Sequence, residues 1–173
     1  TFTSAGNLEA NSIASFDGTN WQNLGSGMDY FVKALTIYNG ELVAGGTFTM
    51  AGGIPASRVA QWNGNSWDIL GDGFGTGFVY ALTVYNGELI AGGTFGIARW
   101  DGSSWQSFGG GLNNYVEALT VYNGELIAGG YFTKAGTMTV NRIAKWNGTN
   151  WQTLGSGMNN YVDSLCVYDD ELI

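Results

Sequence analysis

The sequence lacks the residues that most enzymes and metal sites use. It contains no histidine among its 173 residues, so the commonest general base and the commonest metal ligand are both missing. Its single cysteine, Cys166, excludes an intrachain disulfide framework. Because other copies of a repeat described below carry threonine at this place, we expect Cys166 to be a small buried strand residue. No apolar run reaches the roughly 18–20 residues of a transmembrane helix, so no membrane insertion is expected.

Basic residues are also scarce. Six lysines and arginines stand against 14 acidic residues, which gives a net charge of −8. Nucleic-acid binding needs a basic face that neutralises phosphates, and an anionic membrane surface attracts basic segments, so neither partner is expected. The acidity is read as a contribution to solubility.

Proline is nearly absent, whereas glycine is abundant. One proline and 29 glycines indicate many tight turns with positive φ rather than loose linkers. Apolar residues make up 45% of the chain and aromatic residues 14%, a globular composition that favours strands over helices.

One sequence repeat occurs four times, and its copies begin at Val32, Val79, Val116 and Val162. In the clearest copy two alternating apolar runs flank Asn123-Gly124, the strongest short-range signal for a β-hairpin. In the last copy Asp169-Asp170 replaces the Asn-Gly pair, and we expect a looser turn there. Tryptophans recur with spacings of 46, 38 and 46 residues, a period typical of repeat architectures.

Each repeat unit reads as four short strands. In the first unit they cover 32–38, 41–49, 58–62 and 67–70, and we name them strands A to D. Aromatic residues bracket each C–D turn and are expected to pair across the strands as packing. The glycine pair in each strand B should admit a close neighbour, for which a tryptophan ring is our expectation.

The pattern predicts an all-β fold, a β-propeller of four-stranded antiparallel blades. At residues 124–136 (Gly-Glu-Leu-Ile-Ala-Gly-Gly-x-Phe-Thr-x-Ala-Gly) and 143–151 (Ile-Ala-x-Trp-Asn-Gly-x-x-Trp) the chain resembles kelch-like propeller repeats of bacterial secreted and surface proteins. The tryptophan spacing gives four units of about 46 residues, and the resemblance implies an extracellular or cell-surface location.

The two ends match different halves of one strand B. Residues 1–6 match 47–52, and residues 171–173 match 41–43, so the last blade is split between the termini. In one reading residues 1–173 form a single four-bladed propeller domain closed by these ends. In the other, which we favour, they are a fragment of a longer repeat array or are completed by a neighbouring copy.

One position in strand A varies between the repeats and carries Lys33, Tyr80, Glu117 and Asp163. If strand A is the innermost strand of a blade, these side chains face the central channel and could bind an ion or a small polar ligand. The alternative is that they are solvated or form ion pairs. Two carboxylates without further oxygen ligands are a weak signal for calcium or for acid–base chemistry, so no metal and no cofactor are predicted.

A second candidate surface lies on the loops between units. It combines amides with aromatic rings, which suits neutral glycans as well as ordinary turns. Its residues are Asn113, Asn114, Tyr115, Asn159, Asn160 and Tyr161. We expect the B–C loops on the same face. Separately, Asn147-Gly148-Thr149 is a possible N-glycosylation sequon.

The function expected from these features is that of a non-catalytic, extracellular structural or adhesive repeat module, part of a surface protein or self-assembling fibre. Its partners would be further copies or a continuation of the same chain. The alternative is a lectin-like, glycan-binding propeller that uses the loop face. An enzyme is not expected, because no nucleophile elbow, metal cluster or phosphate-binding loop is present.

Overall fold

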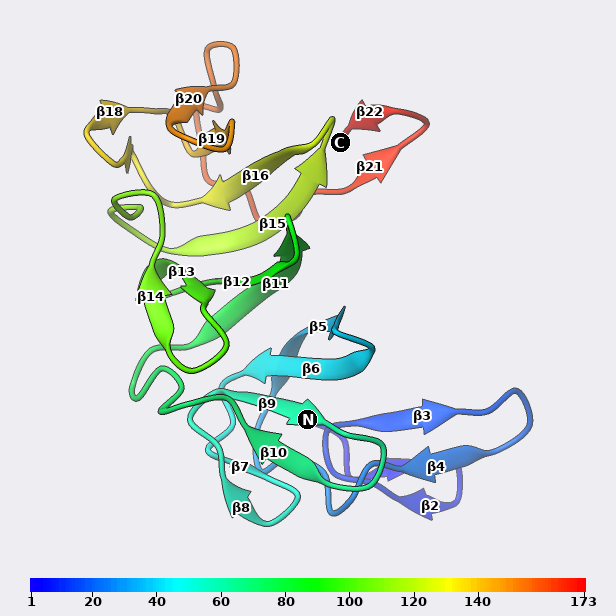
Figure 1. Cartoon of the computed structure of the whole chain (residues 1–173). Helices are drawn as coiled ribbons and strands as arrows, with labels where there is room; N and C mark the ends of the chain where they lie inside the picture. Colours follow the sequence, from blue (N-terminus) through cyan, green and yellow to red (C-terminus); the bar gives the residue numbers. More distant parts are fainter. The chain divides into compact units, whose positions relative to one another are not determined.

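The computed structural model describes residues 1–173 and contains only strands, turns and bends. All sheets are antiparallel and have two or four strands (Figure 1). The predicted all-β class is therefore confirmed. No segment forms a helix of the length and apolarity that membrane crossing requires.

Three sheets have four strands each. The first has the order β10-β9-β6-β5 and is built from β5 (Val32–Tyr38), β6 (Glu41–Gly46), β9 (Val59–Trp62) and β10 (Trp67–Ile69). The second has the order β11-β12-β13-β14 and is built from β11 (Val79–Tyr85), β12 (Glu88–Gly93), β13 (Gly96–Trp100) and β14 (Trp105–Ser107). The third has the order β15-β16-β19-β20 and is built from β15 (Val116–Tyr122), β16 (Glu125–Gly130), β19 (Ile143–Trp146) and β20 (Trp151–Thr153).

The remaining strands form two-stranded sheets. Two of these correspond to halves of a repeat: β3 (Ala14–Phe16) with β4 (Trp21–Asn23), and β21 (Val167–Tyr168) with β22 (Glu171–Leu172). Three more lie in loops: β1 (Ser4–Ala5) with β2 (Leu8–Glu9), β7 (Met50–Ala51) with β8 (Ile54–Pro55), and β17 (Lys134–Ala135) with β18 (Met138–Thr139).

The residues of the split fourth repeat form two two-stranded sheets, β3–β4 and β21–β22. The expected strand from Val162 forms only at Val167–Tyr168, because its partner β22 is two residues long and a strand needs a neighbour for its backbone groups. The same lack of cover leaves Cys166 exposed rather than buried as predicted.

The chain divides into two compact units, an N-terminal unit (Thr1–Val79) and a C-terminal unit (Tyr80–Ile173). Each has its own apolar core. The N-terminal core is made by Ile13, Leu24, Met28, Ala44, Phe48, Ala51, Ala56, Ala60 and Trp67. The C-terminal core includes Tyr85, Ile90, Ile97, Phe108, Leu126, Phe132, Val140 and Trp151.

The A–B hairpin turns have the predicted type I′ geometry. Asn123 and Gly124 both have positive φ, at 49° and 75°, which is the requirement of this turn. Asp169 and Asp170 also have positive φ, at 52° and 60°. The predicted looser turn in the last copy is therefore wrong: the aspartates adopt the same turn, at the steric cost of a Cβ in the left-handed region.

The aromatic pairs across the C–D turns are confirmed. Trp62 and Trp67 have ring centroids 5.3 Å apart, and Phe16 and Trp21 have theirs 5.2 Å apart. The pairs Trp100–Trp105 and Trp146–Trp151 both have centroids 5.4 Å apart. These rings stabilise each C–D hairpin through cross-strand contact.

The glycine pairs of strand B admit backbone and aliphatic groups, and not the tryptophan that we predicted. A Cβ added to Gly129 would lie 2.6 Å from Cγ1 of Val162. A Cβ on Gly130 would lie 2.1 Å from the carbonyl oxygen of Tyr115. The first glycine of the pair thus lets the next repeat pack on the sheet, and the second lets the preceding loop cross it.

Candidate functional site

Four tyrosines of the C-terminal unit form a continuous row of ring contacts. Tyr80 and Tyr115 have centroids 6.4 Å apart, and Tyr115 and Tyr131 have theirs 6.0 Å apart. Tyr131 then stacks on Tyr161, with centroids 4.5 Å apart and planes 11° apart. We call this set, Tyr80, Tyr115, Tyr131 and Tyr161, the tyrosine row.

Backbone hydrogen bonds around one glycine bring the row together. The amide of Tyr131 donates to the carbonyl oxygen of Tyr115 at 2.8 Å, and the amide of Val162 donates to that of Gly130 at 3.3 Å. Tyr115, Tyr131 and the residues next to Val162 therefore lie close together around Gly130. Tyr131 was missed from the sequence, because the corresponding residues Thr47 and Thr94 are not aromatic.

The variable strand-A position lies at a β-bulge. The register of β15 and β16 shifts between Val116 and Ala118, so Glu117 is the additional residue. The same shift occurs between Val32 and Ala34 and makes Lys33 the additional residue of β5. A bulge leaves its additional residue outside the ladder and turns its side chain in a new direction.

The carboxylates of Glu117 and Asp163 contribute to raised pKa values in the tyrosine row. Desolvation and then the charges of Glu117 and Tyr115 raise the pKa of Tyr80 above its ordinary value. Desolvation, followed by Tyr161 and then Asp163, raises the pKa of Tyr131 in the same way. These two phenols are therefore protonated at neutral pH and can donate hydrogen bonds, while the carboxylates can only accept them.

The structure brings together part of the predicted set. Tyr80, Glu117, Tyr115, Tyr161 and Asp163 share one site in the C-terminal unit. Lys33 belongs to the N-terminal unit, where its Nζ lies 5.3 Å from the ring centroid of Phe31 in a cation–π contact.

The predicted asparagines mainly order their own loops. Asn113 Oδ1 accepts hydrogen bonds at 2.8 Å from the amides of Thr133 and Lys134, so it clamps the B–C loop to the D–A loop. The expected placement of both loops on one face is therefore confirmed. Asn114 and Asn160 accept from the amides of the tyrosines that follow them, at 2.8 and 2.9 Å. Asn159 is exposed.

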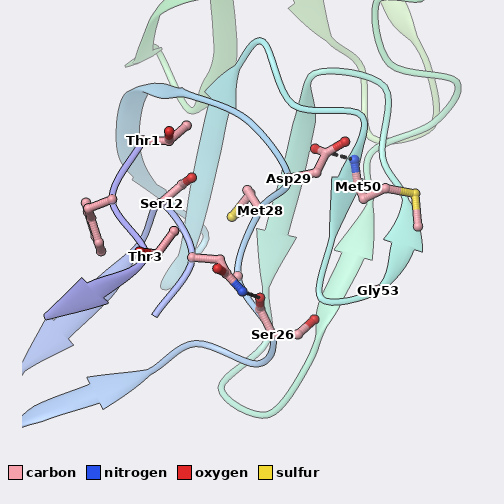
Figure 2. A pocket seen from close by; sticks show the side chains of 11 residues that line it. Thr1, Thr3, Ser12, Ser26, Met28, Asp29, Met50 and Gly53 are labelled. Atoms are coloured by element: carbon pink, nitrogen blue, oxygen red, sulfur yellow. Dashed lines mark hydrogen bonds between the residues drawn. The ribbon is translucent and has the colours of Figure 1, made fainter. Parts of the chain in front are cut away.

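The N-terminal unit has the same clamp beside a hollow of about 430 Å³. Figure 2 shows the carboxylate of Asp29 turned to the amide of Met50, which donates to it at 2.9 Å. The side-chain amide of Asn11 donates to the carbonyl oxygen of Ser26 at 3.1 Å. Desolvation opposes ionisation of Asp29, but hydrogen bonds from Thr49 and Met50 outweigh it and lower the pKa of the carboxyl. These polar groups hold loops in place.

Asn147 of the possible sequon is exposed in a C–D turn. Its Oδ1 accepts hydrogen bonds from the amides of Thr149 and Asn150, at 3.0 and 2.9 Å. Asp17, Asn63 and Asp101 occupy the same turn position and accept the same pair of amide hydrogen bonds. The side chain therefore has a turn-forming role common to all repeats.

Comparison with known proteins shows structural likeness alone. No family model matches the chain, and no curated protein matches it. The chain is similar to the computationally designed Ika4 protein, with a TM-score of 0.57, 16% identity and 86% of each chain covered. It is also similar to the computationally designed Ika8 protein, with a TM-score of 0.58 and 16% identity, where it spans 43% of that chain. At this identity the likeness concerns the fold.

Proposed function

We propose that this chain is a β-propeller repeat module, kelch-like in kind, with a non-catalytic structural or adhesive role at the cell surface or in a self-assembling fibre. The observation that carries the proposal is a contact between a strand-B glycine and the next repeat, and this contact occurs twice. Gly92 lies against Val116 and Leu119, and Gly129 lies against Val162 and Leu165.

Such a contact suits a stack of blades. In these two cases a strand-B glycine lies against the valine and leucine of the next repeat, so that one repeat does not bury its apolar face alone. Radial packing of four-stranded sheets by this means is the propeller arrangement. Ion pairs also join neighbouring strands within a sheet: Glu88 pairs with Arg99 at 2.7 Å, and Glu125 pairs with Lys145 at 2.8 Å.

The assembly test uses the purified 173-residue chain. We expect mass photometry over a concentration series to show discrete oligomers or growing particles, and negative-stain electron microscopy to show rings or filaments. A monomer at every concentration, with neither rings nor filaments, would contradict the structural role. The accessibility of the sequon can be tested separately, because glycosylation at Asn147 in a secreting eukaryotic host would add mass that Asn147→Gln removes.

A second candidate function, glycan binding, is favoured by the tyrosine row. Tyr115 and Tyr161 are 43% and 45% exposed, so both offer ring surface for stacking on a sugar face. Asp163 and Glu117 supply acceptors for sugar hydroxyls beside these rings. A glycan array with the wild type, Tyr161→Ala and the control Tyr168→Ala tests this function. Binding that is lost only in Tyr161→Ala supports it, and equal signals from all three contradict it.

A further inference from the structure

A hollow in the N-terminal unit is lined by three aromatic rings and one guanidinium group. Its volume is about 460 Å³, within the range of about 300–1,000 Å³ that takes small organic ligands. All of its lining residues belong to the N-terminal unit. They are Tyr30, Phe31, Thr47, Thr49, Arg58 and Phe78.

The corresponding place in the C-terminal unit is filled by a tyrosine ring. In the repeat, Thr47 corresponds to Tyr131 and Phe78 corresponds to Tyr161. Tyr131 stacks on Tyr161, with ring centroids 4.5 Å apart and planes 11° apart. In both units the amide of the threonine or tyrosine donates to the residue before strand A, at 2.9 and 2.8 Å, so the backbone is the same. Because threonine has no ring, the hollow beside Phe78 corresponds to the space that a flat phenol occupies in the other unit.

Two further rings form a corner of the hollow. Tyr30 and Phe31 meet edge to face, with centroids 6.2 Å apart and planes 67° apart. They are 56% and 44% exposed, so both offer ring surface to a ligand. Aromatic rings attract one another in offset or edge-to-face arrangements at centroid distances of about 4.5–7 Å. The lining therefore suits a flat aromatic ring.

Arg58 adds a positive charge with unused donor capacity. Its Cζ lies 5.2 Å from the ring centroid of Phe78, and its Nη1 donates to the carbonyl oxygens of Thr47 and Phe48 at 2.6 and 3.3 Å. The two ion pairs of the chain involve other residues. Its Nε and the Oγ1 of Thr47 are buried without a hydrogen-bond partner. A guanidinium has five donors in a planar fork that matches a carboxylate, so an anionic group has a partner here.

The charges around the hollow also favour an anion. Lys33, whose Nζ lies 5.3 Å from the ring centroid of Phe31, occupies the repeat position that carries Glu117 in the C-terminal unit. Asp29 is the carboxylate bonded to a lining residue, and it already accepts from the hydroxyl of Thr49 at 2.5 Å and from two amides at 2.8 and 2.9 Å. A cationic ligand is disfavoured, since Arg58 already takes the cation position beside an aromatic ring.

We propose that this hollow binds a small aromatic carboxylate. The flat ring of the ligand lies against Phe78 in the place that the Tyr131 ring takes in the other unit, and its carboxylate accepts hydrogen bonds from Arg58. Neither the assembly role nor the tyrosine row uses these residues. The inference therefore stands apart from both proposed functions.

The test is a titration of the ¹⁵N-labelled 173-residue chain followed by two-dimensional NMR, with phenylacetate as the probe. We expect saturable shifts at the amides of Thr47, Thr49 and Arg58. The amine 2-phenylethylamine offers a similar ring with the opposite charge. It should bind at least about tenfold more weakly, because it gains no charge-assisted hydrogen bond and meets the guanidinium.

Two variants test the location and the charge of the site. Thr47→Tyr fills the hollow as Tyr131 does in the other unit, and should abolish the saturable shifts in a chain that still folds. Arg58→Met keeps an apolar stem and removes the guanidinium, and should raise the dissociation constant about tenfold or more. Arg99→Met removes an equal charge from a residue outside the hollow. It is the matched control and should leave the dissociation constant unchanged.

Three results would overturn the proposal. The first is the absence of saturable shifts in the wild type at millimolar phenylacetate. The second is equal affinity for phenylacetate and 2-phenylethylamine, which would remove the role of the charge. The third is unchanged binding in a folded Thr47→Tyr chain, which would place the probe elsewhere. Should Arg58→Met not fold, the amine still tests the charge and Thr47→Tyr still tests the location.

Discussion

Tyr131 stacks on Tyr161 with nearly parallel rings, and the two residues come from different repeats of the chain. Neither repeat on its own would create the contact. It depends on the hydrogen bond from Val162 to Gly130, which fixes the end of one repeat beside the beginning of the next. The pair is therefore a sensitive probe of the packing between repeats.

Replacing Tyr161 by alanine should destabilise the C-terminal unit. An aromatic pair contributes about 0.5–1.5 kcal/mol beyond its buried area, and we expect a loss of about this size in the free energy of unfolding measured in urea. Tyr168→Ala, at a tyrosine that is 73% exposed, should leave it nearly unchanged. Equal losses in the two variants would show that the stacking contributes nothing specific.

Replacing Gly129 by alanine should also destabilise the protein. Its new Cβ would lie 2.6 Å from Val162 Cγ1, and overpacking of this kind costs about 1–3 kcal/mol. The double variant with Val162→Ala makes room for the new methyl group. We expect it to lose less than the sum of the single changes, since residues in contact are not additive. A strictly additive double-mutant cycle would argue against a direct contact between these two residues.

Acid should weaken the C–D turn at Asp101 and not the turn at Asn147. Hydrogen bonds from the amides of Ser104 and Ser103 hold the pKa of Asp101 below its ordinary range. Its folded pKa lies below the unfolded value, so this stabilisation is present above about pH 4 and is lost as the pH falls below that value. We expect the melting temperature to fall as the pH is lowered from about 6 to about 2, a range that spans this value.

Asp101→Asn is the matched variant for this measurement. Asn63 and Asn147 accept the same two amide hydrogen bonds without a charge. The variant should therefore fold with an intact turn and show a flatter dependence of the melting temperature on pH in the acid range. Parallel pH profiles for wild type and variant would assign the acid sensitivity to other carboxylates.

Changing Asp170 to glycine should stabilise the β21–β22 hairpin. Asp170 has φ of 60°, where the other hairpins have glycine. A side chain in the left-handed region costs about 1–2 kcal/mol, part of which is offset by the entropy that glycine adds to the unfolded chain. We expect slower amide hydrogen exchange at Cys166 and Ile173, whose backbones are hydrogen-bonded. Faster exchange would show that Asp170 stabilises the turn in another way.

The local structure was predictable because its causes lie within a few residues. Asn123-Gly124 selects its hairpin turn through the φ values that these two residues tolerate. The spacing of Trp146 and Trp151 around one turn then sets them opposite each other across two strands. Alternation of apolar residues predicted the strands of the three four-stranded sheets, although strand β6 ends at Gly46 and the strand expected from Val162 is limited to Val167–Tyr168.

The candidate site was predictable only in part. Tyr80, Glu117 and Asp163 stood out because they vary at one place in a constant repeat. Tyr131 did not, because the corresponding residues Thr47 and Thr94 are not aromatic. The role of Asn113 as a clamp was also hidden, since its partner Thr133 lies 20 residues further along the chain.

The sequence alone determined the strands, the turns and the repeat, because these depend on backbone preferences and on the two-residue period of a strand. Only the tertiary structure decided what meets across the repeats. It placed Val162 rather than a tryptophan on Gly129 and left Cys166 exposed. Contacts of this kind depend on how whole sheets pack, and short-range propensities do not specify that packing.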